Sequence, residues 1–147
     1  MNAVEQHIEG FRYDRWANGL WLEWLDAHPK ESQAHNIVSH MLAAAQIWLL
    51  RCQGESPGQM PIVEIVASSL EDQLAGWTSV LNSQPNDAVI RYRNTRGEPF
   101  ELSLENIVLH VVNHGTYHRG ELRGLCRAVG WEDFPETDRL VYSLANR

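Results

Sequence analysis

Four long stretches of this chain repeat apolar side chains at steps of three and four residues. This spacing constrains the fold more than any other feature of the sequence. The stretches cover about residues 4–27, 33–53, 62–81 and 103–129. Steps of three and four place apolar side chains on one face of an α-helix. The sequence therefore predicts four amphipathic helices that must bury these faces against one another.

Residues that break or cap helices separate the four stretches. Pro29 disfavours helical geometry in the residue before it, and Ser32 is suited to cap the second helix. The loop over residues 53–61 is rich in glycine and proline, which ends the second helix. Gly130 suits the left-handed position that follows the last residue of a helix. We expect the fourth helix to end at about Val129.

Between the third and fourth helices the period changes from helical to strand-like. Residues 88–92 and 98–102 read as two short strands around a turn in which Gly97 adopts a positive φ. The tail over residues 131–147 reads as a loop followed by a short docked segment at Leu140-Val141-Tyr142. The fold class expected is all-α, a four-helix bundle with a crossover connection that carries a short β-hairpin. A length of 147 residues predicts one domain over residues 1–147.

Composition excludes several classes of function. The net charge is −7 and Lys30 is the only lysine, so we expect no nucleic-acid binding, which needs clustered cations. The longest apolar run, residues 41–50, is too short to span a bilayer, and no export signal opens the chain. These features predict a cytoplasmic protein without a membrane partner. Cys52 and Cys126 are expected to be reduced thiols.

Histidines are the most informative residues of the chain. His110, His114 and His118 are spaced by four, so their side chains stack along one side of the fourth helix. At about 100° per residue, His114 and His118 lie within or beside the arc that faces the core. His40 lies on the apolar stripe of the second helix. Two helices that point imidazoles into one interior predict a divalent transition-metal site with an open position for water or substrate.

Other interpretations of these residues remain open. A histidine pair at this spacing is also typical of a solvated helix face, so a metal-free structural bundle is an alternative. The chain has no H-E-x-x-H, Glu-x-x-His or CxxC motif, which argues against a zincin, a di-iron bundle and a zinc ribbon. His110 is a candidate fourth ligand, although a structural role suits its place at the edge of the arc. Three imidazoles do not by themselves select zinc, nickel, copper or iron.

Three segments of the sequence resemble the DinB superfamily of metal-binding four-helix proteins. They are Tyr13-Asp-Arg-Trp-Ala-Asn18, the stretch from Ile37 to Trp48, and His110-Val-Val-Asn-His114-Gly-Thr-Tyr-His118-Arg-Gly-Glu121-Leu. The expected hairpin with Gly97 also agrees with the family. The resemblance implies that His40, His114 and His118 are the metal ligands, that the metal is zinc or nickel, and that the protein forms a homodimer. One departure is Glu121, where the family usually has glutamine; this carboxylate could contact the metal or orient a ligand.

Two functions follow from the resemblance, while the sequence itself identifies no catalytic residue. The first is a metal-dependent enzyme, either a thiol-dependent transferase or a related hydrolase, acting on a small-molecule substrate or thiol. The second is a non-catalytic metal- or small-ligand-binding bundle, such as a sensor or an interaction module.

The tryptophans of the first helix bear on oligomeric state. Trp16, Trp21 and Trp24 point in more than one direction, and one face of a helix cannot bury all three against the core. Such exposed aromatics would mark a homodimer interface, unless the tail covers them and leaves a monomer.

Overall fold

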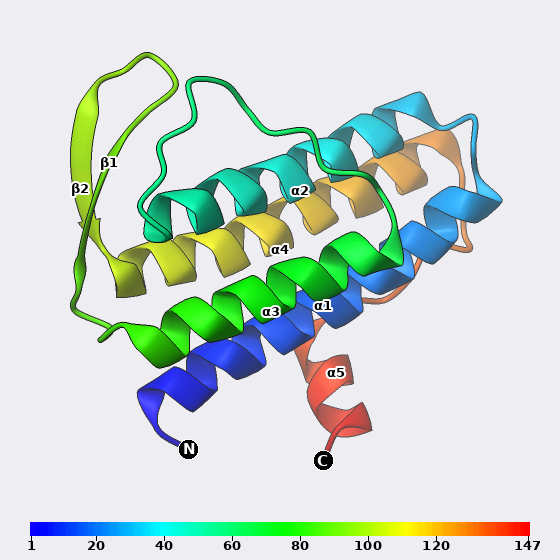
Figure 1. Cartoon of the computed structure of the whole chain (residues 1–147). Helices are drawn as coiled ribbons and strands as arrows, with labels where there is room; N and C mark the ends of the chain where they lie inside the picture. Colours follow the sequence, from blue (N-terminus) through cyan, green and yellow to red (C-terminus); the bar gives the residue numbers. More distant parts are fainter.

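The structure, a computed structural model, describes residues Met1–Arg147. It contains five helices and one two-stranded antiparallel sheet (Figure 1). The elements in chain order are α1 (Ala3–Ala27), α2 (Ser32–Cys52), α3 (Ala67–Ser83), β1 (Val89–Arg93), β2 (Pro99–Ser103), α4 (Leu104–Val129) and α5 (Arg139–Ala145). A mostly helical chain with one hairpin between its third and fourth helices is therefore confirmed.

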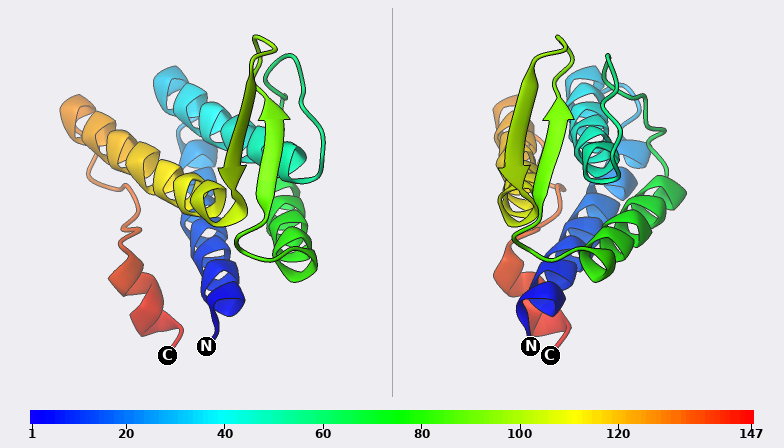
Figure 2. Two further views of the ribbon diagram at one scale, coloured as in Figure 1. Left: turned by 90° about the vertical axis from the view of Figure 1, so that its left-hand side faces the viewer. Right: turned by 60° about the vertical axis from the view of Figure 1, so that its left-hand side comes forward.

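The four long helices pack side by side. Helix α1 contacts α3 and α4, and α2 contacts α4 and α3 (Figure 1). The hairpin stands at one end of these helices, as the two views of Figure 2 show. The short helix α5 returns to contact α1. The pair α2 and α4 matters most for function, because the candidate metal ligands belong to these two helices.

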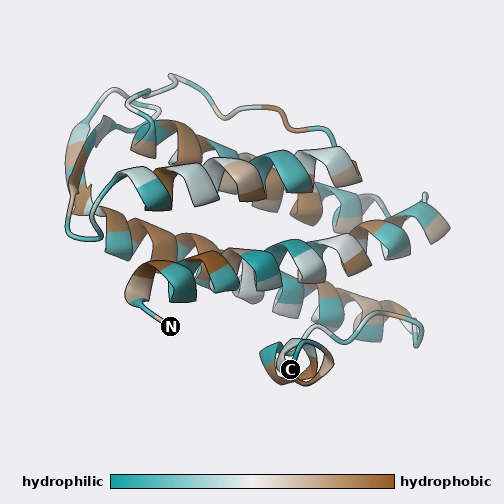
Figure 3. Cartoon of the chain, turned by 60° about the horizontal axis from the view of Figure 1, so that its bottom comes forward, coloured by the Kyte–Doolittle hydropathy of each residue, from teal (hydrophilic) through white to brown (hydrophobic).

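Two hydrophobic clusters fill the space between the long helices. The cluster nearer the hairpin contains Phe11 and Trp77, whose rings stack with centroids 4.7 Å apart. The other cluster contains Trp21, Leu42 and Leu122. Along each helix apolar and polar segments of the ribbon alternate (Figure 3), as expected for amphipathic helices. Burial of the apolar faces therefore holds the four helices together.

The ends of the helices agree with the sequence except at the starts of α2 and α3. Gly130 follows α4 in the left-handed conformation, with φ of 95°, and Ser103 caps its first turn. Helix α2 was expected to be capped by Ser32, which is wrong. Ser32 is already the first helical residue, and Glu31 occupies the cap position without a side-chain capping bond. The side chain of Glu31 instead accepts a hydrogen bond from the indole of Trp131 in the tail.

The third helix begins later than its apolar residues suggested. It starts at Ala67, so the expected start at Ile62 is wrong. Ile62 does not lie on a buried helix face and is 99% exposed. Val63 and Ile65 are the residues of this segment that pack on the core, and they alternate with exposed Ile62 and Glu64. This period of two belongs to extended backbone, which suits the β-branched side chains of the segment.

The hairpin joins α3 to α4 as expected, with each strand one residue later along the chain. Ile90 pairs with Leu102, Tyr92 pairs with Phe100, and Gly97 takes φ of 81° in the turn. The ring of Tyr92 meets Trp48 of α2, with centroids 5.1 Å apart. The hairpin therefore rests on α2 and leads directly into α4.

The tail covers the aromatic side chains of α1. Trp21 and Trp24 are 1% and 5% exposed, and the half-buried Trp16 packs against Tyr142 of α5. The expectation of an exposed aromatic patch on the first helix is therefore wrong, because chain segments distant in sequence bury these rings within one chain. No helix of the structure combines the length and the apolar character needed to cross a membrane.

Candidate metal centre

Three imidazoles from two helices meet at one point. His40 comes from α2, and His114 and His118 come from successive turns of α4. The Nε2 atom of His114 lies 3.3 Å from Nε2 of His40 and 3.1 Å from Nε2 of His118. One nitrogen from each of the three side chains lies within 4.8 Å of the others. The group could therefore hold a metal ion, and it contains the three histidines expected from the sequence.

The site lies at the edge of the contact between α2 and α4. His40 was expected among apolar residues on the buried stripe of its helix, but the structure leaves it exposed, with His114 and His118 partly buried. The core positions of α4 are taken by apolar side chains such as Ile107 and Leu122, both 0% exposed. An imidazole at the margin keeps access to water and avoids the cost of an unpaired buried nitrogen. The group therefore opens to solvent on the side of His40.

A carboxylate fixes the orientation of one imidazole. The Nδ1 atom of His118 donates a hydrogen bond to Oε1 of Glu121, 3.0 Å away and one turn further along α4. A proton on Nδ1 leaves the lone pair on Nε2, which is the atom that faces the other two histidines. Glu121 lies outside the three-histidine group itself. The structure thus gives it the orienting role that the sequence left undecided.

The environment of His40 and His114 favours their neutral forms. Burial, together with the neighbouring His118, His40 and His110, lowers the pKa of His114 to about 4. Burial also lowers the pKa of His40, followed by the effect of His118, while the charge of Glu121 opposes both. The neutral form of imidazole is the one that binds metal ions.

His110 lies close to the group without belonging to it. Its exposed ring is 5.4 Å from that of His114 and 5.6 Å from that of Trp48, measured between centroids. Trp48 also lines a small cavity behind His114, of about 10 Å³, together with Met41 and Asp14. Trp48 therefore lies beside the site, as its position two turns beyond His40 suggested.

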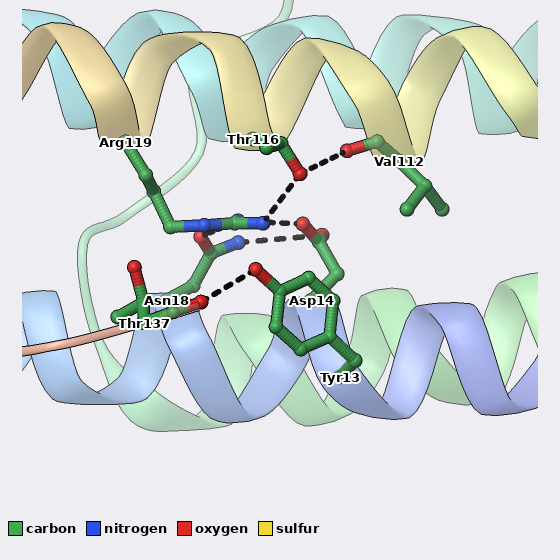
Figure 4. A network of polar contacts seen from close by, with 7 residues as sticks. All are labelled: Tyr13, Asp14, Asn18, Val112, Thr116, Arg119 and Thr137. Atoms are coloured by element: carbon green, nitrogen blue, oxygen red, sulfur yellow. Dashed lines mark hydrogen bonds and ion pairs between the residues drawn. The ribbon is translucent and has the colours of Figure 1, made fainter. Parts of the chain in front are cut away.

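Sequence analysis missed a polar network between α1 and α4 (Figure 4). Arg119, only 3% exposed, donates from Nη1 to Oδ1 of Asp14 at 2.7 Å and to Oδ1 of Asn18 at 2.8 Å. Burial raises the pKa of the Asp14 carboxyl above its usual value, and the charge of Arg119 offsets only part of that rise. Asp14 and Asn18 belong to a segment that carries the family resemblance. The sequence signal for the network itself is that Asp14 and Arg119 are charged residues on the otherwise apolar faces of α1 and α4.

The remaining polar candidates lie apart from the histidine group. Asn113 is exposed and donates to the carbonyl of Leu109 in its own helix, as a surface residue does. His28 stacks on Trp24 and lies 3.1 Å from the carboxylate of Asp133, so it ties the tail to α1.

The two cysteines are buried and unpaired. Burial raises the pKa of Cys52 to about 12 and that of Cys126 to about 11. Both thiols are therefore protonated near neutral pH, whereas the nucleophilic form of cysteine is the thiolate.

Taken together, the fold and the site define a mostly helical protein in which adjacent long helices carry a three-histidine group able to hold a metal ion. The model of the DinB family matches residues 1–144, so the chain belongs to the DinB family. No curated protein matches the chain.

Proposed function

We propose that this protein is a metal-dependent enzyme that uses a divalent transition metal, zinc or nickel, held by His40, His114 and His118. The observation that carries the proposal is the convergence of three Nε2 atoms at a place that is open to solvent. Three protein ligands and an open position are typical of catalytic metal sites, whereas structural sites are closed by four ligands.

The residues present suit such a metal. Three neutral imidazoles form a donor set for zinc, nickel or related ions, and His118 is already oriented by Glu121. A bound metal would supply Lewis acidity, which lowers the pKa of a water or thiol placed beside it. Since Cys52 and Cys126 are buried, a reacting thiol has to come from a second molecule. The enzyme is then a thiol-dependent transferase if such a thiol takes that place, or a hydrolase if water does.

The proposal treats residues 1–147 as one domain, a four-helix bundle with a crossover connection, that acts in the cytoplasm as a homodimer. The family membership supports the bundle and the dimer. The substrate is a small molecule, and neither nucleic acid nor a membrane takes part.

The ligand assignment is tested by elemental analysis of the purified protein and its variants. We expect about one transition-metal ion per chain in the wild type and strongly reduced loading in His40→Ala and His118→Ala, because two ligands bind more weakly than three. His110→Ala is the matched control, since it removes an imidazole from the same helix but outside the group. Bound metal should also raise the melting temperature by mass action. Equal loading in all of these proteins would contradict the assignment.

Catalysis is tested by incubating metal-loaded protein with a panel of thiols and electrophilic acceptors. Turnover that disappears in His118→Ala would support the enzyme. Stoichiometric binding of one panel member without turnover would instead favour a sensor or interaction module. An absorption spectrum separates the metals, because nickel shows d–d bands and zinc does not.

A further inference from the structure

A second cavity lies between α1, α4 and residues 135–139 of the tail, away from the three histidines. Its volume is about 560 Å³. Arg119, Thr116 and Arg123 line it from a different face of α4 than the one that carries His114 and His118. Gly10 of α1 and Gly120 of α4 border the cavity, so neither helix fills it with a side chain at these positions. A cavity of this size suits a small molecule.

The buried guanidinium of Arg119 has hydrogen-bond donors without a full set of acceptors. Arg119 lines the cavity and is only 3% exposed. Its Nη1 is occupied by Asp14 and Asn18, and Nη2 reaches the hydroxyl of Thr116 at 3.4 Å (Figure 4). The Nε atom is buried and has no partner. A buried donor without an acceptor is costly, and an anionic acceptor gives the strongest compensation.

The carboxylates that line the cavity are already occupied. Glu136 accepts from Nη1 of Arg123 at 2.9 Å and from the backbone amide of Asp138 at 3.2 Å. Asp138 accepts from the amide of Leu140 at 2.8 Å, where it caps α5. Each of these acidic groups therefore already accepts a hydrogen bond from the chain itself.

A second arginine lines the same cavity without a carboxylate partner. Nη1 of Arg139 donates to the hydroxyl of Ser143 at 2.6 Å, and its guanidinium lies over the ring of Tyr142, 4.9 Å from the centroid. The other guanidinium donors of Arg139 remain available. The lining of the cavity thus holds three arginines, Arg119, Arg123 and Arg139, against two carboxylates, Glu136 and Asp138, although the protein as a whole has a net charge of −7.

We propose that the cavity bordered by Gly10, Gly120, Arg119 and Arg139 binds a small molecule that carries a carboxylate or phosphate group. The anionic group pairs with the two arginines. The rest of the molecule lies against Val112 and Pro135, which also line the cavity and are only partly buried. This ligand is distinct from any substrate at the histidine group.

The test is calorimetric titration of the full-length protein, with and without metal, using inorganic phosphate and succinate as probes at low ionic strength. We expect saturable binding of at least one probe at a ratio of one per chain, whether or not metal is present. Binding of phosphate alone or of succinate alone would identify the anion that the site prefers. Absence of saturable binding of both probes at millimolar concentrations would overturn the proposal.

Two glycine variants locate the binding. Gly120→Leu places a side chain at the cavity, and a Cβ added at Gly120 meets no other atom within 4 Å, so we expect the fold to tolerate it. Gly124→Leu is the matched control, because Gly124 lies one turn further along α4, is equally free of neighbours and lines a different groove. We expect Gly120→Leu to weaken binding by roughly tenfold or more through exclusion of the ligand, while Gly124→Leu binds as the wild type does. Equal binding by the two variants would place the anion elsewhere.

Arg139→Gln provides a test that leaves the buried network intact. It removes one charge at the exposed rim of the cavity. We expect weaker binding of the probe and a smaller loss of affinity on addition of salt, since one charge-assisted contact is gone. An unchanged affinity and an unchanged salt dependence would contradict the role of this arginine.

Discussion

Each histidine of the site has two ring nitrogens, and the choice between them decides whether the group can bind a metal. In His118 Glu121 accepts a hydrogen bond from Nδ1, so Nε2 carries the free lone pair that faces the other two histidines. No such partner is present for His40, whose ring is exposed. The orientation of the site therefore depends on one carboxylate more than on any other neighbour.

Removal of this carboxylate should weaken metal binding. We expect Glu121→Ala to lower metal affinity by about 10–100-fold, because loss of an orienting partner typically has an effect of that size. Glu121→Gln should lose less, since the amide oxygen still accepts from Nδ1. A competition titration with a chromophoric chelator measures both. If Glu121→Ala binds metal as tightly as the wild type, Glu121 does not orient the ligand.

The buried cysteines predict a pH-dependent reactivity. Burial raises their pKa values to about 12 for Cys52 and about 11 for Cys126, so the thiolate fraction stays small at pH 8 and grows as the pH rises toward these values. Native protein should therefore react slowly with iodoacetamide at pH 8 and faster at pH 10. Denatured protein at pH 8 is the control and should react at the rate of a free thiol. Fast labelling of the native protein at pH 8 would contradict the burial of both thiols.

At the scale of elements, α1 and α4 are joined by an ion pair as well as by apolar contacts. Gly115 of α4 is required here, because an added Cβ would lie 2.5 Å from Oδ1 of Asp14. The close approach brings Asp14, with a side chain only 14% exposed, against the guanidinium of Arg119. The two helices are therefore held in a defined register at the point where α4 also carries His114 and His118.

Breaking this pair should destabilise the fold. We expect Asp14→Asn to lower the free energy of unfolding by about 3 kcal/mol, because it leaves the buried charge of Arg119 without its counterion. Denaturation by urea, followed by circular dichroism, measures the change. Asp26→Asn is the matched control, since Asp26 lies exposed on the same helix, and it should differ from the wild type by less than about 0.5 kcal/mol. Similar stabilities of the two variants would contradict the importance of the pair.

At the scale of the whole molecule, the structure changes which surface could form a homodimer interface. The aromatic side chains of α1, expected at an interface, are covered by the tail of the same chain. Apolar side chains remain exposed at several places on the surface, among them Phe100 of β2 at 49% and Leu109 and Tyr117 of α4 at 47% and 73%. An interface between two copies would therefore have to use a surface other than the one that the sequence suggested.

We still predict a homodimer, on the strength of family membership. Light scattering over a range of micromolar concentrations should give a mass near twice 16.8 kDa. Tyr117→Ser, at an exposed position of α4, leaves the core untouched and shows whether that surface contributes to assembly. A mass near 16.8 kDa at every concentration would refute the dimer.

The sequence by itself determined the local features of this protein. Helical period, glycine positions and the strand-like alternation around Gly97 indicated the long helices and the hairpin to within a residue or two, except at the start of α3. The spacing of His114 and His118 by four likewise placed both on one side of α4 without reference to any other element. These features are local because backbone geometry fixes which residues of one segment share a face.

Tertiary structure alone decided how these faces meet. The packing of α2 on α4 left His40 at the exposed margin of the contact, and the return of the tail helped to bury Trp24 beside His28. The pairing of Asp14 with Arg119 and the cavity beside it also depend on contacts between residues about a hundred positions apart. Periodicity along a helix determines on which face of the helix a side chain lies. Whether that side chain is buried depends on which other segments pack against that face.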